Sequence, residues 1–284
     1  MSHTEPRLLL DALIFPEGPR WHDGRLWFSD MHAHEVVAVD ESGSRETMAV
    51  LEHSPSGLGW LPDGRLLVVS MEDRRLLRRE DDGRLAVHAE LAHLAPFHLN
   101  DMVVDHHGNA YVGNFGFDLH GGGKARPTCL ILVTPDGRAR VVAEDMAFPN
   151  GAVVTPDGGT LIVAESFGKR LTAFAVRSDG TLTHRRTWAS LDVHPDGIAL
   201  DEAGCVWVAN PMAPGGFVRV AEGGRVEDRI DLAQHAGFAC ALGGADRKTL
   251  FLLEAIDPSP NNDPQRGNGW IRATRVDVAG AGIP

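Results

Sequence analysis

The sequence predicts an all-β fold, a six-bladed β-propeller with a metal site on its axis, and three observations favour it. Six stretches of the 284 residues share one pattern at a regular spacing. Short runs rich in β-branched and aromatic residues end in turns of the Asp-Gly type. The 32 glycines and 17 prolines interrupt the chain too often for long helices. We expect residues 1–284 to form a single propeller domain.

The repeated unit starts at a polar residue, usually followed by glycine, and passes through a short apolar stretch and a glycine turn into a β-rich run. The leading residue is eight positions before the turn glycine in four copies: Ser56 and Gly64, Asn100 and Gly108, Asn150 and Gly158, Asp196 and Gly204. In the first copy, Glu17 and Gly24 are seven apart. Taking Phe238 as the sixth leading residue, the copies follow one another at 39, 44, 50, 46 and 42 residues. These steps match the length of a four-stranded blade.

Each copy contains enough strand and turn signals for four strands. The pairs Asp23-Gly24, Asp63-Gly64 and Asp157-Gly158 predict tight hairpins with positive φ. A second run and a second turn follow in each copy, as in VVAVDESG. Residues 7–13 are expected to complete the last blade beside residues 270–278, which would close the ring and remove an unpaired sheet edge. The alternative is a large antiparallel sandwich.

Composition and charge exclude several classes of protein. The 27 basic and 39 acidic residues leave a net charge of −12, which argues against nucleic acid and anionic membranes as partners. No apolar run approaches the roughly 20 residues of a membrane span, and the start of the chain lacks the layout of a signal peptide, so we expect a cytoplasmic protein. Cys129, Cys205 and Cys240 are expected to be small buried hydrophobic residues. The oligomeric state is not predicted.

The leading residues of the six copies form the candidate site. They are Glu17, Ser56, Asn100, Asn150, Asp196 and Phe238. A propeller brings equivalent positions of its blades together around one channel, so these residues should meet although they are distant in sequence. Glu17, Asn150 and Asp196 would form an all-oxygen set with two negative charges, suited to one divalent ion such as Ca²⁺, Mg²⁺ or Mn²⁺. The alternative interpretation is that these residues only form turns.

The sequence resembles the lactonases of the gluconolactonase and regucalcin (senescence marker protein) type. The resemblance extends over essentially the whole chain and rests on four short motifs in order at blade spacing. They are F-P-E-G-P at 15–19, N-D at Asn100 and Asp101, F-P-N-G at 148–151 and P-D-G at 195–197. The resemblance implies a hydrolase of sugar (aldono)lactones, or of similar small lactones, in carbohydrate metabolism.

The resemblance also implies a role for each candidate residue. Glu17, Asn150 and Asp196 would bind the metal, which could be Ca²⁺, Mg²⁺, Mn²⁺, Zn²⁺ or Fe²⁺. Asn100 would lie at the open side of the ion, and Asp101 would contact the substrate. His98 stands where regucalcin-like members have a substrate-binding arginine. Counting on without gaps places Asp118 at an acidic substrate contact.

The expected chemistry follows from such an ion. A metal with an open position would polarise the ester carbonyl and stabilise the oxyanion that forms when water attacks. The resemblance implies that Asp196 would accept a proton from that water, and His98 and His194 are alternative bases.

Other functions remain open at this stage. A phosphotriesterase resembling diisopropyl fluorophosphatase would use the same fold and an axial metal, and a non-catalytic propeller would bind metal or ligand without turnover. The segment 164–168 nearly matches the G-x-S-x-G motif of serine hydrolases, but lacks the first glycine. His32 and His34 could bind a transition metal, although histidines at the surface, or histidines whose hydrogen bonds are satisfied, are the favoured interpretation.

Overall fold

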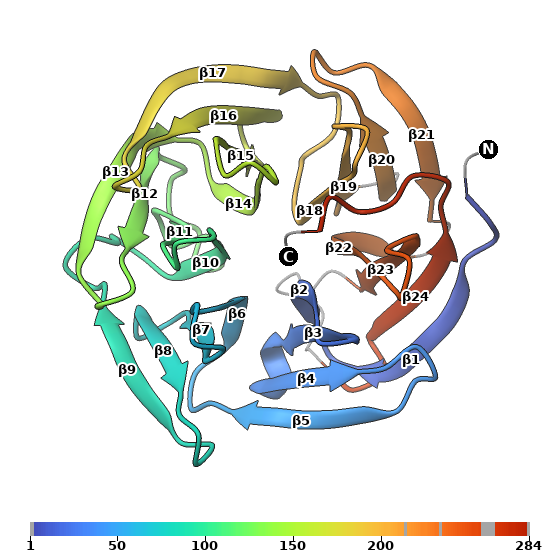
Figure 1. Cartoon of the computed structure of the whole chain (residues 1–284), viewed down its shortest axis with the longest axis horizontal. Coiled ribbons are helices and arrows are strands. Elements are labelled where there is room, and N and C mark those ends of the chain that lie inside the picture. Colours follow the sequence, from blue (N-terminus) through green and yellow to red (C-terminus); the bar gives the residue numbers. More distant parts are fainter. Residues whose placement is uncertain (1–2, 213–214, 233–234, 257–264, 283–284) are drawn as a thin grey trace.

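A computed structural model describes residues 3–212, 215–232, 235–256 and 265–282. In this part of the chain, 24 strands form six four-stranded antiparallel sheets arranged in a ring (Figure 1). The six-bladed propeller predicted from the repeat is confirmed, and the sandwich alternative is wrong. The strand that begins each repeat is the innermost strand of its blade, close to the central axis.

Blades 1 to 3 follow one another along the chain from inner to outer strand. Blade 1 comprises β2 (Pro16–His22), β3 (Arg25–Asp30), β4 (Glu35–Val39) and β5 (Arg45–Val50), with the 3₁₀ turn η1 (Met31–Ala33) after β3. Blade 2 comprises β6 (Pro55–Trp60), β7 (Leu66–Ser70), β8 (Arg75–Arg79) and β9 (Leu85–Glu90). Blade 3 comprises β10 (Leu99–Val104), β11 (Ala110–Asn114), β12 (Thr128–Val133) and β13 (Ala139–Met146).

Blades 4 to 6 complete the ring, and the last blade takes its outer strand from the start of the chain. Blade 4 comprises β14 (Pro149–Val154), β15 (Thr160–Glu165), β16 (Arg170–Val176) and β17 (Leu182–Ser190). Blade 5 comprises β18 (Ile198–Leu200), β19 (Val206–Asn210), β20 (Gly216–Val220) and β21 (Val226–Asp231). Blade 6 comprises β22 (Ala236–Gly243), β23 (Thr249–Ala255), β24 (Gly269–Arg275) and β1 (Arg7–Leu13). The predicted closure by residues 7–13 is confirmed, because β1 pairs antiparallel with β24.

The hydrophobic core lies between neighbouring blades. Each adjacent pair of blades shares a cluster of buried apolar side chains. Between blades 6 and 1, for example, Leu13, Phe28 and Phe251 are almost completely buried in one cluster. Burial of apolar surface is the main favourable term in folding, so the interfaces between blades hold the ring together and leave the axis free for polar groups.

Glycine follows the leading residue in four of the six inner strands because these strands approach one another closely. A Cβ atom on Gly57 would lie 2.3 Å from the backbone nitrogen of Met102, and one on Gly197 would lie 2.5 Å from the Cβ of Ala239. The glycines therefore permit the convergence of the strands, and the interpretation of the motifs as mere turn formers is wrong. Blade 3 differs, because Asp101 stands at this position.

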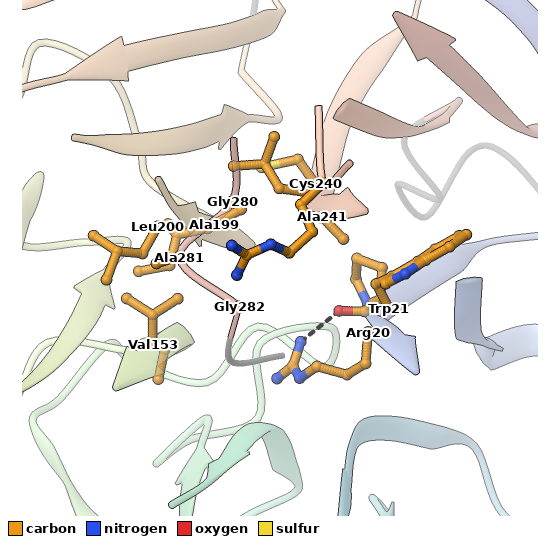
Figure 2. A pocket seen from close by; sticks show the side chains of 15 residues that line it. Arg20, Trp21, Val153, Ala199, Leu200, Cys240, Ala241, Gly280, Ala281 and Gly282 are labelled. Carbon is orange, nitrogen blue, oxygen red and sulfur yellow. Dashed lines mark hydrogen bonds between the residues drawn. The ribbon is translucent and has the colours of Figure 1, made fainter. Parts of the chain in front are cut away.

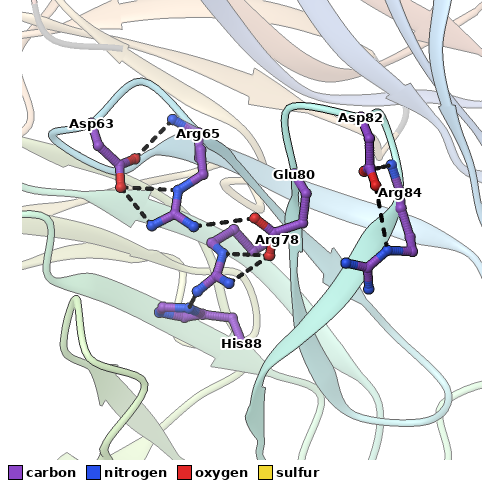
Figure 3. A network of polar contacts seen from close by, with 7 residues as sticks. All are labelled: Asp63, Arg65, Arg78, Glu80, Asp82, Arg84 and His88. Carbon is purple, nitrogen blue, oxygen red and sulfur yellow. Dashed lines mark hydrogen bonds and ion pairs between the residues drawn. The ribbon is translucent and has the colours of Figure 1, made fainter.

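A network of exposed and half-buried ion pairs lies at the rim of blade 2 (Figure 3). Arg65 contacts Asp63 at 2.6 Å and Glu80 at 3.2 Å, and Arg78 contacts Glu80 at 2.5 Å. Such pairs contribute little to stability, because water screens them.

Among the described residues, no helix has both the length and the apolar character needed to cross a membrane.

Candidate active site

A pocket of about 490 Å³ lies where the inner strands begin. The residues that line it come from two positions in the blade repeat. One is the start of the inner strand, and the other is just after the second strand. Backbone hydrogen bonds fix one register against the other, from Met31 N to Phe15 O at 2.9 Å and from Met71 N to Ser54 O at 3.0 Å. The fold therefore presents side chains from distant parts of the sequence to one cavity.

The structure brings most of the predicted leading residues into this pocket. The lining includes Glu17, Asn100, Asn150, Asp196 and Phe238. Ser56 is absent from the lining, and its backbone oxygen accepts a hydrogen bond from Ser29 Oγ at 2.6 Å.

Glu17 and Asp196 share an environment that disfavours two negative charges. Burial raises the pKa of Glu17 well above its ordinary value, and the nearby Asp196 carboxylate raises it further. Burial likewise raises the pKa of Asp196, with Asp101 adding repulsion and a hydrogen bond from the Asn150 amide opposing it. The two carboxylates and the Asn150 amide are therefore close enough to act on one another.

The donor set of Glu17, Asn150 and Asp196 fits a divalent cation. Asp196 Oδ1 is buried and has no hydrogen-bond partner, which is costly for a carboxylate unless a cation faces it. Carboxylate and amide oxygens are the ligands that Ca²⁺, Mg²⁺ and Mn²⁺ prefer. Elsewhere the described residues contain no cluster of three or more His, Cys, Asp or Glu side chains suited to a metal. The predicted set differs from such a cluster because its third donor is an amide.

One side chain and one backbone oxygen orient the two amides of the site. Asn150 Nδ2 donates to Ser166 Oγ at 3.4 Å, and Ser166 Oγ donates to the backbone oxygen of Pro195 at 2.7 Å. Asn100 Nδ2 donates to Pro149 O at 3.1 Å. The Ser166 hydroxyl proton is thus engaged with Pro195, which argues against a nucleophilic serine in the segment 164–168.

The structure places Asp101 outside the pocket lining, contrary to its predicted contact with substrate. Its carboxylate accepts a hydrogen bond from Arg20 Nη2 at 2.9 Å and one from the backbone of Met102 at 2.8 Å. Both members of the Arg20–Asp101 ion pair have only 6% of their side chains exposed. Asp101 occupies the glycine position of the repeat, so its side chain lies between inner strands instead of in the cavity.

Asp118 is also outside the pocket that contains Glu17. It is exposed, accepts a hydrogen bond from Gly121 N at 2.7 Å, and lines a separate groove with Phe97 and Phe117. Besides Glu17 and Asp196, a third acidic residue lines the pocket, Glu72, which the sequence analysis missed. Burial alone would raise the pKa of Glu72, but hydrogen bonds from the side chain and backbone of Ser54 bring it below its ordinary value.

Several histidines surround the pocket. His98 lines it as predicted and stacks on Phe97 with ring centroids 4.1 Å apart. His194 also lines it, together with two histidines that were not predicted there, His32 and His120. His32 is half-buried at this site. His34 lies elsewhere, with Nδ1 3.0 Å from the backbone oxygen of Glu52.

A second, much smaller cavity lies further along the same inner strands (Figure 2). Its volume is about 80 Å³, and its lining includes Arg20, Val153, Leu200 and the segment 280–282. That segment is held there by a hydrogen bond from Ala281 N to Leu200 O at 3.0 Å. Figure 2 shows Arg20 turned back to the backbone oxygen of Pro19. The pocket that contains Glu17 and Asp196 has about six times the volume of this cavity.

Solved structures of the same fold match this chain over nearly its whole length. A calcium-binding regucalcin from Agrobacterium tumefaciens has a TM-score of 0.80 at 21% identity, and the match covers 98% of this chain and 95% of that one. A gluconolactonase from Xanthomonas campestris has a TM-score of 0.74 at 22% identity, covering 95% and 89%. At these identities the likeness shows the fold.

Two curated relatives and a family model indicate the same family. A pentonolactonase from Haloferax volcanii is 25% identical over 99% of this chain and 97% of its own. A 6-deoxy-6-sulfogluconolactonase from Pseudomonas putida is 29% identical over 100% of this chain and 99% of its own. The model of the SMP-30/gluconolactonase/LRE-like region matches residues 15–256. With the family model matching most of its length, the chain belongs to the SMP-30/gluconolactonase/LRE-like family.

Proposed function

We propose that this protein is a metal-dependent hydrolase that opens the ester bond of a sugar lactone or a similar small lactone. The observation that carries the proposal is the buried, unbonded Oδ1 of Asp196 beside Glu17 and Asn150. The family supports it, as do the names of the two curated relatives, both of which are lactonases. We also propose that residues 1–284 act as one domain.

Glu17, Asn150 and Asp196 would hold the divalent ion. When bound, such an ion supplies positive charge that polarises an ester carbonyl and makes water more acidic. The residues around it have separate tasks. Asp196 accepts the proton of the attacking water, and Ser166 keeps the Asn150 amide oriented. Water adds across the ester bond, the ring oxygen leaves as a hydroxyl group, and the product is a hydroxy acid.

The polar wall of the pocket would bind the substrate. Asn100 lies beside the metal ligands in the same cavity, and we assign its amide to the lactone group. His98 and Glu72 also face this cavity, and their hydrogen-bonding groups suit ring hydroxyls. Hydrogen bonds to the hydroxyls would orient the lactone ring, and a correctly oriented substrate reacts faster.

Chelation and two isosteric substitutions test the proposal. The protein is stripped of metal, assayed by pH-stat with D-glucono-δ-lactone and a pentonolactone, and then restored with Ca²⁺, Mg²⁺, Mn²⁺ or Zn²⁺ in turn. Glu17→Gln and Asp196→Asn each replace a charged oxygen donor by an amide, so both should weaken metal binding and lower kcat/KM by at least about 100-fold. Asp118→Asn makes the same chemical change outside the pocket and should keep parental activity.

Other results would change the assignment. Parental turnover in Glu17→Gln or Asp196→Asn would show that these residues are not the metal ligands. Hydrolysis of phosphotriesters without hydrolysis of lactones would indicate a phosphotriesterase, and metal binding without either activity would indicate a sensor.

A further inference from the structure

Much of the pocket lining is apolar. Ten of the 21 described residues that line it are apolar, and they come from all six blades, among them Phe148, Phe167 and Met212. Hydrogen-bonding side chains such as Glu72 and His98 lie between them. Apolar surface of this extent does not suit a fully hydroxylated sugar lactone, because unpaired hydroxyls are costly to bury.

Apolar side chains continue to the mouth of the pocket, where they are exposed. Phe167 is 47% exposed, Met212 52% and Leu119 36%. All three line this cavity. Large exposed hydrophobic residues that gather at one site commonly mark a binding surface. Their place inside the cavity of Glu17 and Asp196 points to the substrate as the group that covers them.

Phe167 is fixed in position before any ligand arrives. Its ring packs on Phe148 with centroids 4.8 Å apart and on Phe117 at 5.8 Å. Its backbone nitrogen donates to Ala147 O at 3.2 Å. The preceding residue but one, Glu165, is buried and binds Arg170 at 2.8 Å. This support gives a rigid apolar surface, which binds a ligand without a large entropic cost.

Apart from the proposed metal ion, the pocket offers no fixed positive charge to a substituent of the substrate. No lysine or arginine is among the described residues that line it, and the residues outside the described ranges include neither type. Glu72 adds a carboxylate to the lining. A carboxylate, phosphate or sulfonate on the part of the substrate that lies away from the metal would therefore lack a lysine or arginine partner.

We propose that the pocket selects lactones carrying an uncharged apolar substituent, an alkyl chain or an aromatic ring that packs against Phe167, Met212 and Leu119. This inference rests on the proposed lactonase function and specifies its substrate class. The cavity volume of about 490 Å³ lies within the range of pockets that enclose drug-sized ligands, so it has room for a ring and a side chain.

A substrate series measures the preference. The metal-loaded protein is assayed with δ-hexalactone, with δ-decalactone, which has a pentyl in place of a methyl group on the same ring carbon, and with an analogue whose chain of similar length ends in a carboxylate. We expect kcat/KM for δ-decalactone to exceed both other values by at least about ten-fold, because four additional methylenes become buried.

Two variants locate the preference in the apolar wall. Phe167→Ala and Met212→Ala should each lower the ratio of kcat/KM for δ-decalactone to kcat/KM for δ-hexalactone by at least about three-fold, through a higher KM for δ-decalactone. Val50→Ala removes an apolar side chain that is 67% exposed on β5, outside the lining of the pocket, and should leave the ratio unchanged. A melting curve for each variant verifies that it folds.

Binding of non-hydrolysable lactams separates this inference from the proposed function. Calorimetry compares the pentyl-substituted and methyl-substituted δ-lactams on the parent protein and on Phe167→Ala. Tighter binding of the pentyl lactam by the parent, lost in the variant, supports the apolar site even if no lactone is hydrolysed. Equal binding of the two lactams, or a preference for the carboxylate-bearing substrate, would overturn the inference whether or not lactones are turned over.

Discussion

Arg20 and Asp101 form an ion pair that is almost completely buried. Arg20 lies on β2 three residues after Glu17, and Asp101 lies on β10 next to Asn100. Arg20 Nη2 lies 2.9 Å from Asp101 Oδ1, and Nη2 also donates to Met102 O. Arg20 Nη1 donates to Pro19 O at 2.8 Å. The negative charge of Asp101 helps to raise the pKa of both Glu17 and Asp196. The positive charge of Arg20 lowers the pKa of Glu17, so it offsets part of the repulsion between the carboxylates near the axis. The ion pair therefore affects both the stability of the inner strands and the electrostatics of the site.

Breaking this pair should be strongly destabilising. In Arg20→Met the carboxylate of Asp101 stays buried without its partner, and we expect the free energy of unfolding, measured in urea, to fall by about 3–5 kcal/mol. The double variant Arg20→Met, Asp101→Asn removes the stranded charge and should recover part of that loss. Arg65→Ala breaks ion pairs of the network in Figure 3 that are far more accessible to water, and it should leave the urea midpoint close to the parent. Equal midpoints for Arg20→Met and Arg65→Ala would contradict a role for the buried pair.

Individual site residues could be predicted only where the repeat register held. Glu17, Asn150 and Asp196 lie near the start of an inner strand, seven or eight residues before a turn glycine, so their convergence could be predicted from spacing. Asp118 was placed by counting into a loop, where no strand keeps the register, and it lies outside the pocket. Asp101 failed for another reason: its orientation depends on Arg20, a contact 81 residues away that no local pattern reveals.

The residues just after the second strand of a blade could also have been predicted from the repeat. Just after β3, β7, β15 and β19 come His32, Glu72, Phe167 and Met212, and all four line the pocket. Because the second strand is antiparallel to the inner strand, its end lies beside the start of the inner strand. Applying the repeat to this second position would have predicted both polar and apolar residues of the pocket lining.

The turns of the repeat were predicted correctly in place but only partly in conformation. Asp23 and Gly24 both have positive φ, at 48° and 73°, as the tightest hairpin turn requires. At Asp63-Gly64 and Asp157-Gly158 the glycine alone has positive φ. There the loop is longer and closes with hydrogen bonds such as Leu61 N to Arg65 O at 2.9 Å. The Asp-Gly pair by itself does not distinguish these loop lengths.

At the level of the inner strand, Gly57 should be far less replaceable than a turn glycine. A Cβ at position 57 would meet the backbone of Met102 at 2.3 Å, and backbone cannot move aside, so Gly57→Ala should cost about 3 kcal/mol of unfolding free energy. Gly204 has a φ of 77° but open space around its Cβ position, and Gly204→Ala should cost about 1 kcal/mol through backbone strain alone. Urea titration of both variants gives the comparison. The opposite order would show that the inner strands can separate without loss.

The number of blades and the closure of the ring could be predicted from the whole sequence, because both depend on spacing and pairing preference. Six copies at blade length require a ring, and a ring whose last blade has three strands requires a fourth from elsewhere. β1 supplies that strand, with Arg7 opposite Ala273 and Leu13 opposite Gly269. The register shifts along this pair, which were not predicted, arise where the outer strand bends around the blade.

Closure by β1 should control the stability of the entire ring, and with it the pocket. Leu13 is fully buried in the cluster that joins blades 6 and 1, whereas Leu8 on the same strand is 50% exposed. Leu13→Ala should lower the free energy of unfolding by about 2–5 kcal/mol, and Leu8→Ala by much less. Because Glu17 and Asp196 come from blades on either side of this closure, an opened ring cannot hold them together. We therefore expect lactonase activity and the β-sheet circular dichroism signal of Leu13→Ala to disappear at the same urea concentration, below that of the parent. Activity that persists beyond the loss of the sheet signal would mean that the site survives without the closed ring.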